Sequence, residues 1–271
     1  IYGWRGPKID KIQRLTQDFK DTQTVRLEQN YRSTKTILDA ANGVISHNGG
    51  RLGKDLWTDG DDGDLIRLYA GCNEQDEARF IVEQIQAGAG EGNTRKSSGI
   101  LYRSNAQSRV IEEALIRGGL PYRIYGGQRF YERLEIRNAL AYLRLVIGRG
   151  DDPALERVIN TPTRGIGSKT VDDLRTIARD QGVSMWQAIV LTQQNSLLST
   201  RARSSLAGFA ALINELDSET LELPIEEMVE HVIHRTGLID FYKAEKGERG
   251  QARVENLEEL VSAAKTFRAE D

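Results

Sequence analysis

The chain has 271 residues, of which 39% are hydrophobic and 28% are charged, and its formal net charge is −3. This composition is typical of a globular protein and excludes a disordered or fibrous chain, and the length is sufficient for two domains with cores of their own. No apolar run is long enough for a membrane span, and the single cysteine cannot form an internal disulfide. The 37 basic and 40 acidic residues nearly balance, so any nucleic-acid binding would depend on local basic patches.

The first 125 residues predict helices that alternate with strands. Apolar spacing predicts helices at 8–19, 34–46, 74–87 and 106–117, and short apolar or β-branched runs predict strands at 24–27, 65–70, 100–102 and 122–125. Strands and helices that alternate at this length indicate a parallel, doubly wound α/β layer.

From Glu132 onward the chain shows only helical patterns, separated by capping signals. Asp151 before Pro153, and Ser184 before Gln187, are typical helix starts. Further helix starts or stops are predicted at Ser168, Ser199, Pro224, Gly237 and Gly247. We therefore expect an α/β domain up to about residue 125 and an all-α domain beyond it.

The turn between the predicted strand at 24–27 and the following helix is the first candidate site. Ligands of α/β domains usually bind at such turns. Here Tyr31 offers a flat stacking surface, and Arg32 offers a planar fork of donors that suits phosphate oxygens. The alternative is an exposed pair on an ordinary loop.

Two further stretches favour a nucleic-acid ligand. Tyr2 and Trp4 lie beside Arg5 on glycine-rich backbone, which is typical of a platform on which single-stranded bases stack. The alternative for Trp4 is a place in the core. Arg103 and Asn105 follow a predicted strand and open a helix, where the helix terminus favours phosphate. The alternative there is a simple helix cap with exposed arginines.

A glycine-rich turn between two predicted helices is the third candidate. Gly165 and Gly167 leave backbone N–H groups open to a phosphate, and further donors come from Arg164, Lys169 and Thr170. This pattern is typical of a helix-hairpin-helix contact with the backbone of a DNA duplex, which positions the duplex without reading its sequence. The alternative is a tight turn in which glycine is needed for its φ angles.

Catalytic or metal-binding sets that would act alone are missing from the sequence. It contains no Gly-x-x-x-x-Gly-Lys-Ser/Thr phosphate loop. His231 and His234 have no third ligand that spacing would supply, and Cys72 has no nearby histidine. No metal site is therefore predicted.

Six stretches, in order, resemble the UvrD/Rep/PcrA helicases of superfamily 1: residues 1–6, 27–34, 100–109, 125–133, 161–167 and 250–260. The resemblance implies an α/β fold, with part of a RecA-like (P-loop NTPase) parallel-sheet domain followed by an all-α inserted subdomain. Residues 1–28 would be the tail of a first RecA-like domain, 29–125 the first part of a second, and 126–271 an incomplete helical subdomain.

The function implied by the resemblance is an ATP-dependent 3′-to-5′ DNA helicase of the bacterial cytoplasm and nucleoid, acting in DNA repair. Tyr31 would stack on adenine, Arg32 would act as an arginine finger on the γ-phosphate, and Arg5 would couple nucleotide to DNA. Single-stranded DNA would contact Tyr2, Trp4, Arg103 and Asn105. The duplex side of a single-strand–duplex junction would contact Arg164, Gly165, Gly167, Lys169 and Thr170. Repair proteins are expected partners, and no membrane is.

The resemblance also implies that parts of the motor are absent. The chain starts at Ile1 without a methionine and ends at Asp271 inside an expected helix, so we expect an excised fragment. The phosphate loop and the ligands of Mg²⁺ would lie upstream, so ATP with Mg²⁺ is expected in the parent and no activity in the fragment alone. Two alternatives remain: a stand-alone DNA-binding or protein-docking module, and a fragment of a RecB/AddA-like helicase-nuclease.

Overall fold

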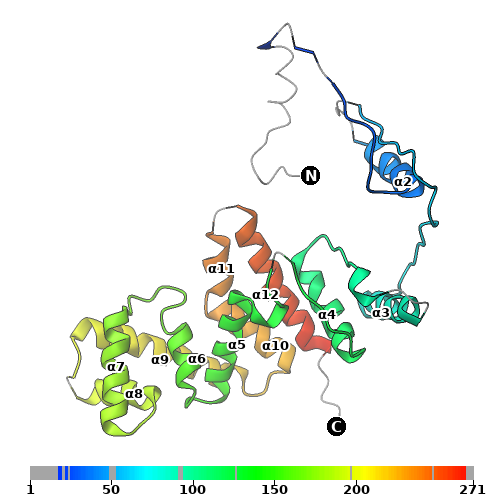
Figure 1. Ribbon diagram of the computed structural model, residues 1–271. Coiled ribbons are helices and arrows are strands. Elements are labelled where there is room, and N and C mark those ends of the chain that lie inside the picture. The colour runs from blue at the N-terminus through cyan, green and yellow to red at the C-terminus, as the bar shows by residue number, and fades with distance from the viewer. Residues whose placement is uncertain are drawn as a thin grey trace. The chain divides into compact units, whose positions relative to one another are not determined.

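The computed structural model describes residues 18–19, 22–23, 25–48, 53–90, 94–125, 127–195, 197–245 and 247–266. The chain divides into two compact units between Asn73 and Glu74. Within the described residues the regular structure is helical (Figure 1).

The α-helices are α2 (Lys35–Ser46), α3 (Glu74–Gly90), α4 (Ser108–Arg117), α5 (Leu134–Ile147), α6 (Asp152–Val158), α7 (Ser168–Gln181), α8 (Met185–Gln194), α9 (Thr200–Thr220), α10 (Ile225–Arg235), α11 (Leu238–Lys243) and α12 (Glu248–Thr266). Short 3₁₀ helices are η2 (Arg95–Ser97), η3 (Asn105–Gln107) and η4 (Phe130–Glu132).

The expected α/β fold with a RecA-like parallel sheet is wrong for the part of the chain that the structure describes. The segments expected as strands form no ladder, and Leu68 and Leu101 are 97% and 98% exposed. The described residues contain one isolated parallel bridge, between Gln29 and Trp57. Alternation of apolar residues sets which face of a strand is buried, but a strand forms only where a neighbour pairs with its backbone N–H and C=O groups. The described residues form no such ladder at the segments expected as strands.

The helices expected before residue 125 are confirmed where the structure describes them. Helices α2, α3 and α4 coincide with the expected ranges to within a few residues, whereas the range 8–19 lies outside the described residues apart from its last two.

The first unit is held together by the bridge between Gln29 and Trp57 and by hydrogen bonds from α2. Asn42 of α2 exchanges hydrogen bonds of 2.8 and 3.1 Å with the backbone of Leu56, and Thr36 Oγ1 donates to the carbonyl oxygen of Asp62 at 2.7 Å.

The expected helix starts in the all-α part are mostly confirmed. Asp151 accepts the N–H of Ala154 at 2.9 Å, Ser199 caps α9, and Ser184 forms a capping box with Gln187. One expectation was off by a residue, because Gly167 is the N-cap of α7 and Ser168 is already helical. These signals are local in sequence, which is why they predict structure well.

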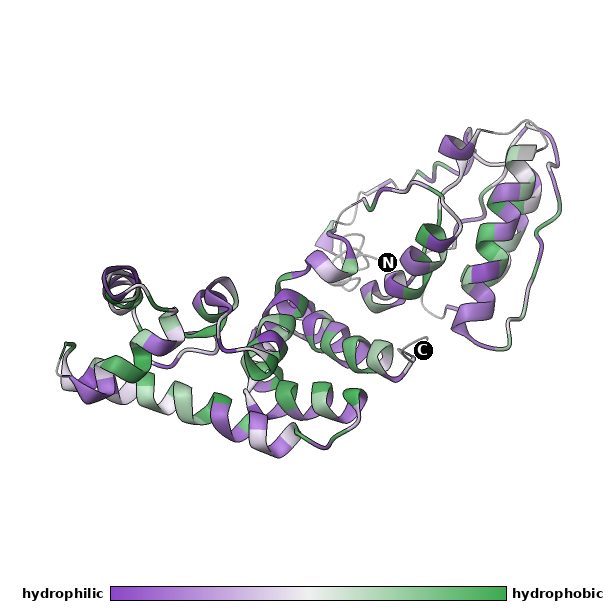
Figure 2. Ribbon diagram, turned by 90° about the horizontal axis from the view of Figure 1, so that it is seen from below, coloured by the Kyte–Doolittle hydropathy of each residue, from purple (hydrophilic) through white to green (hydrophobic). Residues whose placement is uncertain are grey.

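Helix α5 lies at the centre of the second unit, where it contacts α6, α9, α10 and α12. Ile136, Ala139, Tyr142 and Leu145 of α5 are completely buried. These positions lie on one face of the helix, which packs into the core, whereas Arg137 and Arg144 on the opposite face are exposed. The surrounding helices carry both polar and apolar residues (Figure 2), so each can present an apolar face to α5 and a polar face to water.

None of the described helices combines the length and the apolar character that a bilayer crossing requires.

Candidate functional site

The turn before α2 presents Tyr31 and Arg32 on a short, hydrogen-bonded segment. The Oδ1 atom of Asn30 accepts the N–H groups of Arg32 and Ser33 at 2.9 and 2.8 Å, which fixes the turn. The Tyr31 hydroxyl donates to Gln29 Oε1 at 2.7 Å, and the ring is 85% exposed. Gln29 belongs to the bridge with Trp57. The backbone of the turn is therefore held in place, while the two side chains face solvent.

The guanidinium of Arg32 is exposed and makes no hydrogen bond or ion pair with any residue that the structure describes. An exposed aromatic ring next to a guanidinium without a described partner has the chemistry to bind a nucleoside triphosphate. The ring can stack on the base, and the guanidinium can bind phosphate. The described residues contain no group of three histidine, cysteine or acidic side chains able to hold a metal ion.

Tyr2, Trp4 and Arg5 lie outside the described residues. Their expected contacts with single-stranded DNA and nucleotide stay predictions.

Arg103 and Asn105 lie on an ordered turn before α4. Gln107 Oε1 accepts the N–H groups of Arg103 and Ser104 at 3.0 and 2.9 Å, and Ser104 caps η3 in return. The Ser104 hydroxyl also donates to Glu255 of α12 at 3.1 Å. The side chains of Arg103 and Asn105 are exposed on this scaffold. Both can reach a ligand without disturbing the fold.

The glycine turn between α6 and α7 is organised by Asn160. Its Oδ1 atom accepts the N–H groups of Arg164 and Ile166 at 2.7 and 3.2 Å. Ile166 is 2% exposed and anchors the turn in the core. Gly165 has φ +74°, a left-handed conformation that side chains other than glycine rarely adopt. Two N–H groups of the turn are thus bound by Asn160, and its conformation favours glycine at position 165.

The first turn of α7 is open to an anion. Gly167, the N-cap, contributes no side-chain cap, and the first turn contains no acidic residue. The first N–H groups of a helix have no partner inside the helix, and the helix dipole adds partial positive charge there. Lys169 is exposed and Thr170 is half-buried in this turn. A phosphate would meet backbone N–H groups, an ammonium and a hydroxyl.

Arg164 has a different position from the one expected. Its Nη1 atom donates to the carbonyl oxygens of Pro162 and Val158 at 3.0 and 3.3 Å, and Nη2 donates to the carbonyl oxygen of Thr236 at 3.1 Å. The guanidinium also lies over the rings of Tyr142 and Phe209, 5.6 and 5.7 Å from their centroids. Three of its hydrogen bonds end on carbonyl groups inside the protein, so Arg164 supports the turn, and its expected contact with DNA stays a prediction.

A buried polar cluster that the sequence patterns did not single out joins α4, α5 and α12. Arg133, 8% exposed, donates to Asn256 Oδ1 at 2.8 Å, to Ser108 Oγ at 2.6 Å and to the carbonyl oxygen of Asn105 at 2.9 Å. Asn256 Nδ2 donates to Glu135 Oε1 at 2.6 Å. Burial lowers the pKa of the Arg133 guanidinium. The available signal was a pair of charged residues, Arg133 at the N-cap and Glu135 in the first turn of α5.

Arg109 adds a second buried charge to the same region. It is 2% exposed, and it pairs with Glu259 of α12 at 2.6 Å and with Glu113 at 3.1 Å. Burial opposes the charge of the Arg109 guanidinium, but the two carboxylates outweigh it and raise the pKa. Together these charges fix α12 against α4, which stabilises the turn that carries Arg103.

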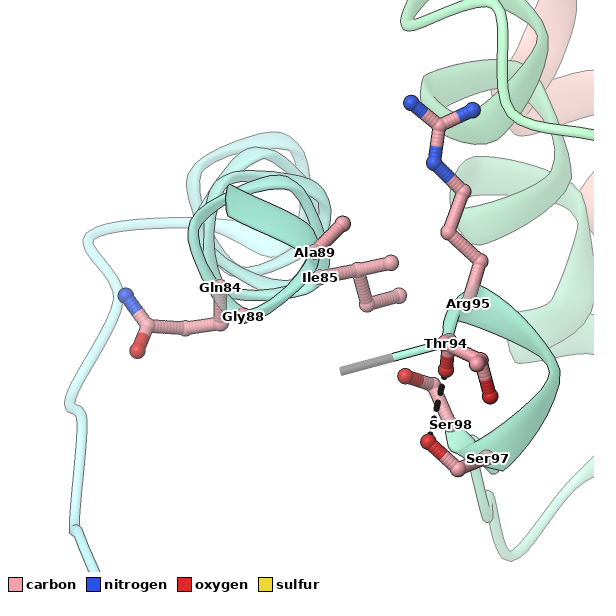
Figure 3. A pocket seen from close by; sticks show the side chains of 8 residues that line it. All are labelled: Gln84, Ile85, Gly88, Ala89, Thr94, Arg95, Ser97 and Ser98. Carbon is pink, nitrogen blue, oxygen red and sulfur yellow. Dashed lines mark hydrogen bonds between the residues drawn. The ribbon is translucent and has the colours of Figure 1, made fainter. Parts of the chain in front are cut away.

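A hollow of about 230 Å³ lies between α3 and η2. Figure 3 shows Ile85 and Ala89 pointing from α3 toward η2, and the Ser97 hydroxyl donating to the carbonyl oxygen of Thr94 at 2.6 Å. Arg95 is the ionisable side chain among the residues that line the hollow.

Comparison with known proteins decides the family. The sequence model of the UvrD-like helicase C-terminal domain matches residues 25–271. The chain belongs to this family.

Several curated relatives of this family resemble the chain. It is 54% identical over 267 residues to DNA helicase II of Escherichia coli (strain K12), a match that covers 98% of this chain and 37% of that protein. It is 45% identical over 270 residues to ATP-dependent DNA helicase UvrD1 of Mycobacterium tuberculosis (strain ATCC 25618 / H37Rv), covering 98% of this chain and 35% of that protein. It is 40% identical over 267 residues to ATP-dependent DNA helicase PcrA of Staphylococcus epidermidis (strain ATCC 12228 / FDA PCI 1200), covering 98% of this chain and 36% of that protein.

The resemblance to the UvrD/Rep/PcrA helicases, inferred from the motifs, is therefore confirmed. The chain spans a little over a third of the length of these relatives.

Proposed function

We propose that this chain is the part of an ATP-dependent DNA helicase that supplies one half of the nucleotide site and a contact surface for duplex DNA. The observation that carries the proposal is the match of residues 25–271 to the UvrD-like helicase C-terminal domain. The relatives that carry this segment are named as DNA helicases. The proposal includes 3′-to-5′ movement at a single-strand–duplex junction, with a role in DNA repair in the bacterial cytoplasm.

In the nucleotide half-site, Tyr31 stacks on the adenine and Arg32 binds the γ-phosphate. ATP with Mg²⁺, when bound, supplies the free energy of phosphoryl transfer. The exposed ring and the unpaired guanidinium support these roles. Arg5 takes part in the same coupling between nucleotide and DNA. The phosphate loop is not in this sequence, so we expect no ATP hydrolysis by the chain alone.

In the DNA contacts, Tyr2 and Trp4 stack on bases of the single strand, and Arg103 and Asn105 bind its backbone. The exposure of Arg103 and Asn105 on a hydrogen-bonded turn supports their part in this. Base stacking on aromatic rings tolerates any sequence, as a translocating motor requires.

The duplex contact is made by the turn before α7. Gly165 and Gly167 let the backbone approach a phosphate, and Lys169 and Thr170 bind it. The uncapped helix terminus without acidic residues supports this role. Arg164 acts here by holding the turn to the core through carbonyl groups. Such contacts bind backbone and carry no base specificity.

The duplex contact can be tested with the chain itself. Affinity for a blunt DNA duplex is measured over a series of salt concentrations for the unmodified chain, Lys169→Gln and Thr170→Ala. Each phosphate contact adds about 0.9 to the slope of log affinity against log salt, so Lys169→Gln is expected to reduce the slope by about 1. Lys243→Gln removes a lysine of α11 that is also exposed, and it serves as the control. Unchanged slopes in both α7 variants would refute the duplex contact.

A further inference from the structure

The loop between Tyr122 and Arg129 is closed at its base by two sets of contacts. The Arg129 guanidinium lies over the Tyr122 ring, 5.2 Å from the ring centroid. The carboxylate of Glu112, a buried residue of α4, accepts the Tyr122 hydroxyl at 3.0 Å and the N–H group of Phe130 at 3.2 Å. One side chain thus holds both ends of the loop, and the residues between them are presented from an ordered base.

This loop lies beside the turn that carries Arg103 and Asn105. The Arg133 guanidinium donates to the carbonyl oxygen of Asn105 at 2.9 Å through Nη1. It also donates to the carbonyl oxygen of Gln128 in the loop at 3.4 Å through Nε. Because both donors belong to one rigid, planar group, the loop and the turn are neighbours. A nucleic acid bound at Arg103 therefore has the loop next to it.

Arg123 and Tyr125 share the solvent-facing side of the loop. Burial alternates from residue to residue here, since Tyr122 and Ile124 are half-buried whereas Arg123 and Tyr125 are exposed. This alternation is that of an extended segment, in which residues two apart point to the same side. Tyr125 is 88% exposed, and neither exposed side chain has a hydrogen bond or ion pair with any residue that the structure describes.

The segment that contains the loop is positively charged. Between Glu113 and Glu132 the sequence contains Arg117, Arg123 and Arg129 but no aspartate or glutamate, within a chain of net charge −3. Such a segment attracts a polyanion. An exposed aromatic ring among arginines suits a single strand in particular, because unpaired bases can stack on the ring while the cations bind the backbone. In a duplex the faces of the bases are stacked inside and cannot reach the ring.

We propose that Tyr125 stacks on a base of single-stranded DNA and that Arg123 binds a phosphate of the same strand, next to the contact made by Arg103 and Asn105. The inference rests on the proposed function and adds a second segment to its single-strand contact. Stacking on one ring does not depend on which base is present, so the added contact keeps binding independent of sequence.

The test measures binding of the chain to a labelled oligothymidylate single strand, and to a blunt duplex of the same length, over a series of salt concentrations. Tyr125→Leu is expected to weaken single-strand binding about 5- to 150-fold, the effect of losing one stacked base. Tyr125→Phe keeps the ring and should bind like the unmodified chain. Arg123→Gln is expected to lower the salt slope for the single strand by about 0.7. Arg249→Gln removes an exposed arginine from the first turn of α12 and, as the matched control, should leave the slope unchanged.

Tyr125→Leu also distinguishes stacking from a role in folding. Because Tyr125 is exposed, its thermal midpoint should stay the same while binding weakens. A lower midpoint together with weakened binding would assign Tyr125 to folding and overturn the inference. Equal weakening by Tyr125→Leu and Tyr125→Phe would also overturn it, because the ring would then not be the group that binds.

The outcomes also separate this inference from the function on which it rests. Normal single-strand binding by Tyr125→Leu and Arg123→Gln, combined with weakened binding by Arg103→Gln, overturns the loop contact and leaves the contact of Arg103 standing. An equal loss of single-strand and duplex binding overturns the assignment to a single strand. Absence of salt-dependent single-strand binding by the unmodified chain overturns both.

Discussion

Arg164 and Thr236 are joined by a hydrogen bond of 3.1 Å, from the guanidinium Nη2 atom to the backbone carbonyl oxygen. This contact links the turn before α7 to the turn between α10 and α11. The two turns also pack together, because a Cβ atom on Gly237 would lie 3.9 Å from the Pro162 ring. The turn before α7, which is the candidate duplex contact, therefore packs against the turn between α10 and α11, a segment that is distant in sequence.

Arg164→Ala is expected to destabilise the chain by about 2–4 kcal/mol, because it removes the donor to the carbonyl groups of Pro162 and Thr236 and the cation that lies over two aromatic rings. Arg164→Lys should recover only part of this, because one ammonium cannot reproduce the planar fork. Urea denaturation measures both. The control Arg179→Ala, at a side chain that is 77% exposed, should stay within about 0.5 kcal/mol. A denaturation midpoint unchanged in Arg164→Ala would contradict this role.

Asn256→Leu is expected to destabilise the chain by a similar amount, about 2–4 kcal/mol. Asn256 is 3% exposed and bridges Arg133 and Glu135, so its loss removes one hydrogen bond from each of two buried charged groups. The unfolding free energy can be compared with that of Asn105→Leu, since the Asn105 side chain is exposed and its change should be below about 0.5 kcal/mol. Equal effects of the two variants would mean that the buried cluster does not stabilise α12.

The helices were predictable from the sequence, whereas the strand-like patterns predicted a sheet that the described residues do not form. Ser184 and Gln187 cap α8 through contacts three residues apart, so the pattern contains all that the structure needs. Leu68 and Leu101 also lie in strand-like patterns, but a strand depends on pairing with distant segments, and the described residues do not pair there.

The sequence indicated which residue types lie at the candidate site, but not which of their side chains face solvent. The pattern around Gly165 correctly indicated a turn with a glycine at positive φ and basic neighbours. It could not distinguish Lys169, which is exposed, from Arg164, which turns inward. The acceptor that decides this, the carbonyl of Thr236, is 72 residues away from Arg164 in sequence. Long-range packing of this kind leaves no local pattern.

Tyr122→Phe is expected to show a pH-dependent loss of stability. The Tyr122 hydroxyl donates to the carboxylate of Glu112 at 3.0 Å, and burial followed by this hydrogen bond raises the pKa of Tyr122 from 10.0 to about 12. The neutral phenol is thus favoured in the folded state. Its contribution, about 1 kcal/mol for one such hydrogen bond, is fully present below pH 10 and lost as the pH rises from about 10 toward 12.

The measurement compares unfolding free energies of Tyr122→Phe and the unmodified chain between about pH 8 and pH 11. The gap between them should be constant below pH 10 and narrow above it. A gap that widens with pH would mean that the phenol ionises more readily in the folded chain, contrary to the raised pKa. Difference absorbance of the two proteins reports the same ionisation directly.

Arg32→Ala, placed in the full-length protein that contains this chain, is expected to lower DNA-stimulated ATP turnover by about 10³- to 10⁵-fold, the range seen when an arginine finger is lost. Because the Arg32 side chain is exposed and unpaired among the described residues, the thermal midpoint should not change. DNA affinity without nucleotide should also stay the same. Lys35→Ala provides a nearby control, since Lys35 is exposed in the first turn of α2 and pairs with Asp39 at 3.0 Å. It should retain turnover. A parallel fall in turnover, DNA affinity and thermal midpoint in Arg32→Ala would instead assign Arg32 a role in folding.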